Sequence, residues 1–516
     1  MTQPILCVVL GMFVRKKKNK SGVISVQIIT KVDGKSRLVK TIGSSANADE
    51  VERLVKEGRV FIHTYAGQQK LDFSNTTELI KSAFTHISSL TEVGTELLLG
   101  RIFDDIGFNR IAEPLFRKLV FARLSNPVSK LKTSAYLLRH KNIEVPVQQI
   151  YRYMDKLHSS QKQEVEAISY QHTLKVLNNR ISVVFYDVTT LYFEIDNEDD
   201  LRKTGFSKEG KHQNPQIVLG LLVGAEGYPL AYDLFEGNKF EGHTMLPVID
   251  AFKRKYGLDK LIVIADSGLL SSANVEELIN KGYAFILGAR IKSEPEATKQ
   301  KILALQLQNG QSAVLERGPL KLVVSYADSR AKKDRYNREK GLAKLEKRVK
   351  TGRLTKANIN NRGYNKYLKL QGEVVVDIDY EKYIKDAQWD GLKGYITNST
   401  MDKEQIIDNY RHLWQIEKAF RIAKSDLKIR PVYHRISRRI EAHICISFAA
   451  YKVYKELERQ LRLLKAGISP ENALDIAKSI FMIEAKTPNS QPVKHLLLLN
   501  DEQRFLAELF QFGDFG

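Results

Sequence analysis

The feature that most constrains the fold of this chain is a series of short apolar runs, separated by turns and helix-type segments, between residues 181 and 288. Short apolar runs bounded by turn residues are typical of buried strands, whereas longer amphipathic segments are typical of helices. Three hairpin-linked strands, then a helix, a strand, a helix and a strand predict an α/β layer with a mixed sheet. The strand-type segments are Ile181–Phe185, Ile217–Val223, Pro229–Leu234, Leu261–Ala265 and Tyr283–Gly288, and the helix-type segments are His243–Tyr256 and the stretch from the N-cap Ser271 to Lys281.

Two different regions precede this layer. Residues 1–45 alternate β-prone runs with turns, among them a hairpin signal at Asp33-Gly34, and predict a small three-stranded sheet with a basic loop at Arg15–Lys18. From Ala48 to Asn179, apolar residues recur at helical spacing and predict a helical region. The basic loop is compatible with a solvated hairpin tip and with a DNA contact, and the helical region is compatible with DNA-end binding and with a scaffold.

Residues 291–395 interrupt the regular order. Within them, Arg330–Lys356 carries twelve Lys or Arg against three acidic residues and has an apolar helical stripe at Leu342, Leu345 and Val349. A solvated amphipathic helix would explain this pattern, but charges of one sign repel unless a counter-surface exists, which favours a helix that faces phosphates. Strand-type segments of this stretch are Ala313–Leu315, Lys321–Ser325 and Glu373–Asp379.

The composition indicates a basic, multidomain, globular protein. A chain of 516 residues is too long for one compact core, so several domains are expected. Its content of 43% hydrophobic and 27% charged residues argues against a largely disordered chain. The formal net charge of +21 favours a nucleic-acid partner, because each Lys or Arg near a phosphate releases a condensed counterion. A ribosome-associated or merely basic protein is the alternative that composition leaves open.

The two cysteines and the N-terminus bear on the cellular compartment. Cys7 and Cys445 are the only cysteines, so a disulfide framework or a cysteine-based zinc site is excluded. The apolar run Ile5–Val14 precedes its basic cluster instead of following one and is not expected to be a signal peptide. No apolar stretch reaches the ~18 residues that a membrane span requires. We therefore expect a cytoplasmic, nucleoid-associated protein that is not bound to a membrane.

Two aspartates occupy unusual places in the apolar strands. Asp187 ends Val183–Tyr186, and Asp266 ends Leu261–Ala265. Either could be a turn residue or a helix cap, but an Asp in an apolar strand is costly to bury unless it binds something. Because both stand at equivalent strand ends, we expect them to hold divalent metal ions, for which carboxylate oxygens are suitable ligands.

A third carboxylate is expected on a long helix over Lys403–Leu427. Tyr410, Glu417 and Lys424 are spaced by seven residues, which places a phenol, a carboxylate and an ammonium on nearly one face of a continuous helix. Taken alone, this spacing is also that of an ordinary charged surface helix.

In their joint order these segments resemble the DDE transposases of bacterial insertion sequences, in particular the branch with the Y-R-E-K signature (insertion-sequence family four and close relatives). The resemblance is carried by Asp187 with Thr189-Thr190, by Ala265–Gly268 and by Tyr410 to Lys424. It continues through Arg430–His434 and Ile440–His443, and Met12–Gly43 is similar to the N-terminal sheet of that group. It implies a ribonuclease-H-like α/β catalytic core with a β-containing insertion, plus an N-terminal small sheet and a helical DNA-binding region.

The resemblance also implies the roles of individual residues. Asp187, Asp266 and Glu417 would be the catalytic triad and would bind two Mg²⁺ ions, with Mn²⁺ able to substitute. Tyr410 and Lys424 would contact the DNA end near the cut. The signature arginine falls at Leu413, which leaves its phosphate contact to Arg411 or Arg421, and Arg421 is better placed, one turn from Glu417.

Two tryptophans are candidates for stacking on a flipped base, a contact that the resemblance implies. Trp389 lies at the end of the interrupting stretch and Trp414 lies next to Glu417. Stacking of a base on an aromatic side chain contributes ~1–3 kcal/mol. The competing interpretation is that both rings belong to the core, which is slightly favoured for Trp414.

The function implied is that of an insertion-sequence DNA transposase. It would bind terminal inverted repeats, cleave the element ends, pass through a hairpin and join the 3′-OH ends to target DNA, with two protomers forming a homodimer on the DNA. A structure-selective nuclease of the same fold and a catalytically silent DNA-binding derivative are the alternatives. The expected regions are 1–47 (small sheet), 48–179 (helical, DNA-binding), 180–290 (core, first part), 291–395 (insertion), 396–455 (core, Glu helix and following helix) and 456–516 (helical, with a dimerisation role).

Overall fold

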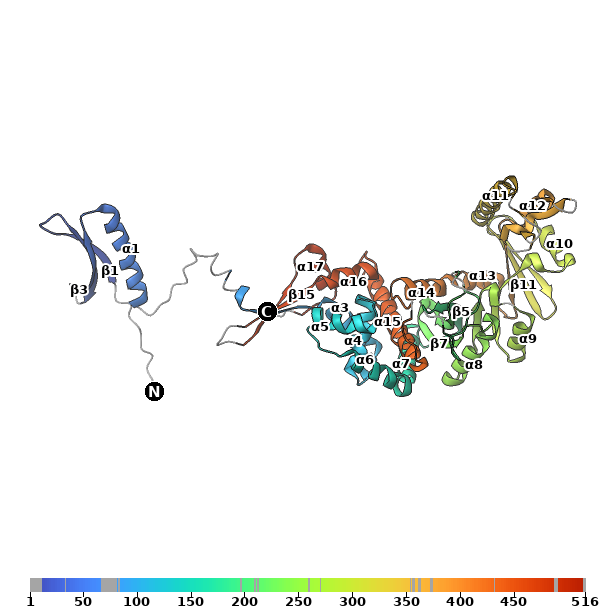
Figure 1. The fold of residues 1–516 in the computed structure, drawn as a ribbon, viewed down its shortest axis with the longest axis horizontal. Helices are drawn as coiled ribbons and strands as arrows, with labels where there is room; N and C mark the ends of the chain where they lie inside the picture. The colour runs from blue at the N-terminus through green and yellow to red at the C-terminus, as the bar shows by residue number, and fades with distance from the viewer. Residues whose placement is uncertain are drawn as a thin grey trace. The chain divides into compact units, whose positions relative to one another are not determined.

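The computed structural model divides the chain into two compact units (Figure 1). The N-terminal unit comprises Met1–Ile87 and Ala485–Ser490, and the main unit comprises Ser88–Glu484 and Gln491–Gly516. The structure describes residues 12–513 except 33, 66–80, 82–83, 195–196, 208–209, 211–212, 259, 270, 353, 355–357, 361–362, 372–374, 431 and 487–490. Cys7, Asp33, Lys356, Glu373 and Pro431, which the sequence analysis singled out, lie outside the described residues.

The N-terminal unit is a three-stranded antiparallel sheet with one helix. The strands β1 (Met12–Lys18), β2 (Ile24–Val32) and β3 (Lys35–Ser45) follow one another in sheet order, and α1 (Ala48–Tyr65) packs on them through a small core around Val26 and Val51. The three-stranded sheet is as predicted from its turn signals. The basic run Arg15–Lys18, however, belongs to β1 and not to a loop, because the chain first turns at Asn19–Gly22.

The first and last segments of the main unit together form a helical bundle. The long helix α15 (Ser437–Leu463) lies against helices that come much earlier in the chain, and Figure 1 shows these segments side by side. The two regions predicted to be helical, 48–179 and 456–516, also contain strands, because β4 lies in the first, β15 and β16 lie in the second, and the three form a sheet of order β16-β15-β4. The elements of this part are β4 (Ile87–Glu92), α3 (Gly94–Ile106), α4 (Pro114–Ser125), α5 (Lys130–Lys141), α6 (Val147–Lys156), α7 (Lys162–Val176), α16 (Pro470–Lys478), β15 (Phe481–Ala485), β16 (Val493–Leu497) and α17 (Asp501–Leu509).

The centre of the main unit is a mixed sheet of eight strands within the described residues, in the order β10-β11-β14-β9-β8-β5-β6-β7. Strand β5 pairs in parallel with β8, which pairs in parallel with β9, and the remaining neighbours are antiparallel. The fold is therefore a mixed α/β fold with a large mixed sheet. The central strands are β5 (Val183–Tyr192), β6 (Gln216–Gly224), β7 (Pro229–Glu236), β8 (Ile262–Ala265) and β9 (Ala284–Ala289).

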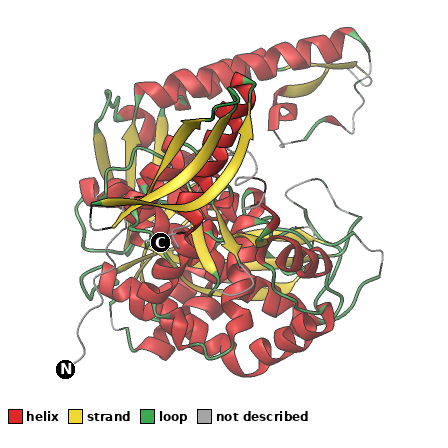
Figure 2. Cartoon of the chain, turned by 90° about the vertical axis from the view of Figure 1, so that its left-hand side faces the viewer, coloured by secondary structure: helices red, strands yellow, loops and turns green. Residues whose placement is uncertain are grey.

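Both faces of this sheet are buried, because side chains alternate along each strand. On β5, Tyr186 and Val188 belong to the core formed with α8 (Met245–Tyr256) and α9 (Ser272–Asn280). Phe185 and Leu191 belong to the larger core that extends into the helical bundle. Helices consequently flank both faces of the sheet. Figure 2 colours the helices of the chain red and its strands yellow.

Strands of the stretch 291–395 extend the main sheet. Strand β10 (Ser312–Arg317) pairs with β11 (Leu320–Tyr326), and β14 (Leu392–Thr397) joins β11 to β9. The helix α11 (Asp328–Lys350) covers a smaller core with Leu345, and its predicted apolar stripe is confirmed. The other elements of this stretch are α10 (Glu296–Ala304), β12 (Leu368–Gln371), β13 (Val375–Ile378) and α12 (Tyr380–Asp386).

The prediction of one continuous helix over Lys403–Leu427 is wrong. The chain forms α13 (Lys403–Arg411) and α14 (Trp414–Ser425), separated by a turn at His412 and Leu413. The break is tight, because the backbone N–H of Leu413 bonds to the carbonyl of Tyr410 and that of Ile416 bonds to Leu413. Among the described helices of both units, none is long and apolar enough to cross a membrane.

Candidate active site

Asp187 and Asp266 lie on neighbouring parallel strands at matching positions. In the pairing of β5 with β8, Tyr186 lies opposite Ala265, and each aspartate is the next residue of the chain. Asp266 directly follows the end of β8, as predicted, whereas β5 continues five residues past Asp187. It continues because β6 still pairs with that part of β5, with Asp187 opposite Leu221. Adjacent strands lie ~4.8 Å apart, so the two carboxylates share one edge of the sheet.

Glu417 reaches this region from the helix α14, which packs against β5 and β6. Its side chain is exposed, as is that of Asp266, while Asp187 is half-buried. The broken helix changes the predicted arrangement, because Tyr410 lies on α13 and Glu417 on α14. Only Glu417 and Lys424 retain the spacing of seven residues on one helix.

Tyr410 nevertheless contacts the site directly. Its hydroxyl donates a hydrogen bond to Oδ1 of Asp266 at 3.3 Å, and the same oxygen accepts the backbone N–H of Ser267 at 2.7 Å. Burial, followed by the charge of Asp266, raises the pKa of the Tyr410 phenol, and the charge of Glu417 acts in the same direction. The phenol therefore stays protonated and orients the Asp266 carboxylate.

Gly288 on β9 makes room for this contact. A Cβ atom at Gly288 would collide with the Tyr410 hydroxyl and would lie 3.0 Å from the backbone nitrogen of Ser267. The helix α13 packs against β9, so the close approach is set by the packing of these two elements. The sequence did not identify Gly288 as a site residue, because a small residue at the end of a strand is common.

Lys393 is the second residue that the sequence analysis missed. Its ammonium lies 4.4 Å from the centroid of the Tyr410 ring, which itself contacts the Tyr395 ring at 4.9 Å between centroids. Burial lowers the pKa of Lys393, assisted by the charge of Arg330 and opposed by the charges of Asp266 and Glu417. A lone lysine beside a glycine in an apolar strand was the signal that could have identified it.

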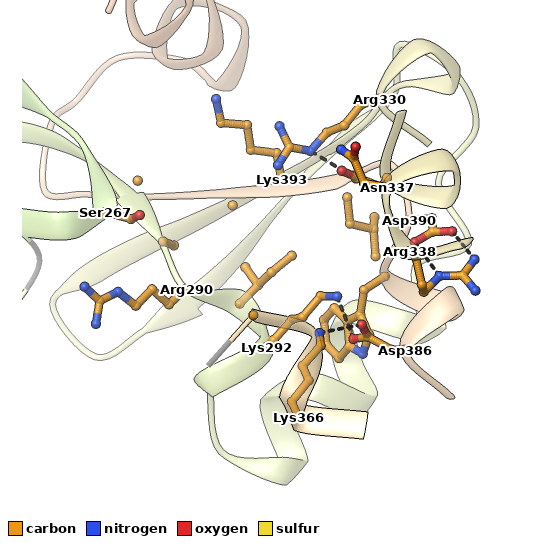
Figure 3. Close-up of a pocket in the computed structure, with 18 of the residues that line it drawn as sticks. Ser267, Arg290, Lys292, Arg330, Asn337, Arg338, Lys366, Asp386, Asp390 and Lys393 are labelled. Atoms are coloured by element: carbon orange, nitrogen blue, oxygen red, sulfur yellow. Dashed lines mark hydrogen bonds and ion pairs between the residues drawn. The ribbon is translucent and has the colours of Figure 1, made fainter. Parts of the chain in front are cut away.

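A pocket of about 740 Å³ opens from Asp266 and Tyr410 toward α11 and α12. Figure 3 shows its basic side chains, including Lys393, Arg290 and Arg330, which come from three different parts of the chain. Lys292 and Lys366 converge on Asp386 at 2.6 and 2.7 Å. Arg290 and Lys393, by contrast, form no ion pair with any described residue, which leaves cationic groups near Asp266 for an external anion.

The remaining candidate DNA contacts are distributed around this site. Trp389 lines the pocket and is half-buried against the core that contains Leu322 and Val324. Part of its side chain is therefore packed in that core, and part is accessible from the pocket. Trp414 is 53% exposed and carries the Lys418 ammonium 5.9 Å from its ring, so it is not a core residue. Arg411 and Arg421 are exposed and Lys424 is half-buried, and none of the three lines the pocket.

The donor set suits a hard divalent cation, but the three carboxylates are not gathered. Among the described residues, no group of three or more His, Cys, Asp or Glu side chains is placed to hold a metal ion. Asp187 and Asp266 fit such a site by their oxygen donors and their adjacent strand positions. The charge of Glu417 acts, together with that of Asp266, on both Lys393 and Tyr410.

Comparison with known families bears on this arrangement. The family model of the transposase DDE domain matches residues 179–452, which include both aspartates, Tyr410 and Glu417. The chain belongs to the transposase DDE family. This membership supports a DNA transposase and therefore a DNA-cleaving enzyme.

No curated protein matches the chain. Among solved structures, the piggyBac transposase synaptic complex with hairpin DNA is similar to this DDE transposase with a TM-score of 0.37 and 10% sequence identity, over 70% of this chain and 69% of the other.

Proposed function

We propose that the protein binds the ends of a mobile DNA element, cleaves them and joins the 3′-OH ends to target DNA, with Asp187, Asp266 and Glu417 as its catalytic carboxylates. The observation that carries this proposal is the register of β5 and β8, which sets Asp187 beside Asp266 at one sheet edge within the family domain. Strands fix such side chains on a rigid frame, as a metal-dependent active site requires.

The metal ligands in this proposal are Asp187, Asp266 and Glu417. Two divalent ions, Mg²⁺ or Mn²⁺, would supply charge stabilisation to the attacking and leaving oxygens of an in-line displacement. Bound cations would offset the mutual repulsion of these carboxylates. Tyr410 holds one oxygen of Asp266 and thereby orients the carboxylate.

The cationic pocket beside Asp266 is suited to the phosphates of the DNA end. Lys393 and Arg290 would hold phosphate oxygens close to the scissile bond, and Trp389 would offer a stacking face at the pocket wall. Arg411, Arg421, Lys424 and Trp414, which lie outside this pocket, would contact DNA further from the cut. The exposed basic residues of α11 would add contacts that carry no sequence information.

Finer features of the proposal rest on the resemblance alone. These are membership of the insertion-sequence family four branch, a ribonuclease-H-like core, recognition of terminal inverted repeats, a hairpin intermediate and pairing of two protomers on two element ends. We also propose the division into regions, with DNA binding by residues 48–179 and dimerisation by residues 456–516. A cytoplasmic location is likewise part of the proposal.

The test is cleavage of a DNA that carries the element's own ends, with Mg²⁺ or with EDTA, by the wild type and by Glu417→Gln. We expect Mg²⁺-dependent cleavage and joining by the wild type and neither by the variant. Cleavage without joining would indicate a structure-selective nuclease. DNA binding without cleavage would indicate a silent derivative.

A further inference from the structure

A second basic pocket, which none of the three proposed catalytic carboxylates lines, lies between the helical bundle and the segment that follows α14. It has a volume of about 460 Å³ and is lined by Arg123, Lys130, Lys132, Lys428, Arg430 and His434, among others. None of the described residues that line it is an Asp or a Glu. The pocket therefore gathers five formal positive charges from three separate segments.

Part of this cluster has an evident structural role. Arg123 is 5% exposed, and its Nη1 donates hydrogen bonds to the carbonyl oxygens of Leu427 and Lys428 at 3.3 and 3.4 Å. His443 holds the neighbouring carbonyl of Ile429 at 3.0 Å. These two side chains satisfy the carbonyls of a strained turn, in which Lys428 has a φ of 42°. Packing of this turn explains why Arg123 and His443 are buried.

Packing does not explain Lys130. Its side chain is 4% exposed and lines the pocket, yet it forms no hydrogen bond or ion pair with any part of the chain that the structure describes. Burial lowers the pKa of Lys130, and the nearby charge of Arg123 lowers it further. A buried ammonium without a partner is costly, and a second cation beside it increases the cost. Such an arrangement is stabilised when an anion enters.

The backbone around Lys130 is also suited to an anion. Lys130 is the first residue of the twelve-residue helix α5, and Ser129 caps the helix by accepting the N–H of Lys132. The N–H groups of the first turn have no acceptor within the helix, and the helix dipole favours negative charge at this end. Leu131 and Tyr433, each 65% exposed, form an apolar rim suited to a sugar or a base.

We propose that this pocket binds a phosphate group of the DNA backbone at a position separate from the scissile bond. The inference rests on the proposed function, because the family supplies DNA as the polyanion. Arg123 bonds to the carbonyl oxygens of Leu427 and Lys428, so the pocket lies just past the C-terminal end of α14. Leu427 follows Glu417 by ten residues, roughly 15 Å along a helix, so one bound DNA end can reach both places. Free inorganic phosphate shares the same chemistry and is the alternative source.

The test compares two pocket variants with a matched control in EDTA, so that no cleavage occurs. The variants are Lys130→Met and Lys132→Met, and the control is Lys175→Met, which removes the same charge from an exposed position on α7 outside the pocket. The probe is a duplex that carries one element end, and its affinity is measured over a range of salt concentrations. A thermal-shift series with inorganic phosphate against chloride at matched ionic strength distinguishes the two sources.

We expect Lys130→Met to weaken DNA binding about tenfold and to lower the slope of log K against log salt by about 0.9, the change for one lost phosphate contact. Because the variant removes an unpartnered buried charge, its melting temperature without DNA should equal or exceed that of the wild type. Lys132→Met, which alters an exposed side chain, should lower affinity and slope in the same direction without affecting folding. Lys175→Met should change neither.

Equal affinity and slope for the two pocket variants and the control would overturn the proposal. Stabilisation of the wild type by inorganic phosphate, with an unchanged DNA salt slope in both pocket variants, would overturn DNA as the source. A loss of folding confined to Lys130→Met leaves Lys132→Met to decide. Failure of the proposed function would appear separately, as absent cleavage in Mg²⁺ with normal DNA binding in EDTA.

Discussion

The hydroxyl of Tyr410 donates a hydrogen bond to Oδ1 of Asp266 at 3.3 Å, joining a helix to a strand end 144 residues earlier. Hydrogen bonds to charged groups contribute ~1.5–3 kcal/mol. We expect Tyr410→Phe to reduce the single-turnover rate of DNA cleavage at least about tenfold, because Asp266 loses its orienting donor. The melting temperature should change little. A cleavage rate equal to that of the wild type would show that this hydrogen bond does not contribute to catalysis.

Gly288→Ala should reduce the cleavage rate through the same contact. The added Cβ atom would collide with the Tyr410 hydroxyl and displace the ring from Asp266. Gly268→Ala is the matched control, because a Cβ atom at Gly268 meets no atom within 4 Å. In a Tyr410→Phe background the obstructing oxygen is absent, so the effect of Gly288→Ala should become smaller. Strict additivity of the two substitutions would contradict this steric account.

The basic face of α11 should contribute to DNA binding by phosphate contacts. Lys333, Lys344 and Lys347 are exposed on this helix. Their joint replacement by Glu should weaken binding of any duplex and flatten its salt dependence, measured by fluorescence anisotropy. The same replacement at the exposed residues Lys175, Lys239 and Lys465 controls for net charge. Identical salt slopes for the two triple variants would show that α11 is only a solvated helix.

Acidification should destabilise the main unit through buried histidines. Burial, assisted by the charge of Lys452 and opposed by that of Glu456, lowers the pKa of His172 to about 4. An unfolded histidine takes up its proton near pH 6.5, so stability is full above this pH and falls as the pH drops from about 6.5 to about 4.

The substitution His172→Gln should reduce the difference in melting temperature between pH 7 and pH 5. The decrease should be partial, because burial also lowers the pKa of His434, to about 3, and that of His443. A wild-type protein that is equally stable at pH 5 and pH 7 would contradict the neutral, buried state of these histidines.

Local sequence patterns predicted the elements that carry the two aspartates. The apolar runs before Asp187 and Asp266 are recognisable because a central strand buried on both faces needs apolar side chains at every position. The N-terminal sheet could be predicted from its turns for the same local reason. That Asp187 lies within β5 and not at its end depends on the length of β6, which no local pattern at Asp187 encodes.

Contacts between distant segments could not be predicted. The pairing of β14 with β9 and β11 joins the stretch 291–395 to the main sheet, and strand pairing of this kind leaves little trace in either strand alone. The break between α13 and α14 contains neither Pro nor Gly, so no sequence signal marks it. Lys393, Gly288 and Lys130 gain their roles only from the neighbours that folding brings to them.

The measurement that tests the central claim most directly is cleavage and strand transfer on a DNA that carries the element's own ends, with Mg²⁺ or EDTA, by the wild type and by Asp187→Asn. The account predicts Mg²⁺-dependent 3′-OH ends that join to a second DNA in the wild type. Asp187→Asn should form neither product while it binds DNA with unchanged affinity in EDTA. Cleavage and joining by Asp187→Asn at the wild-type rate would contradict the assignment of the active site.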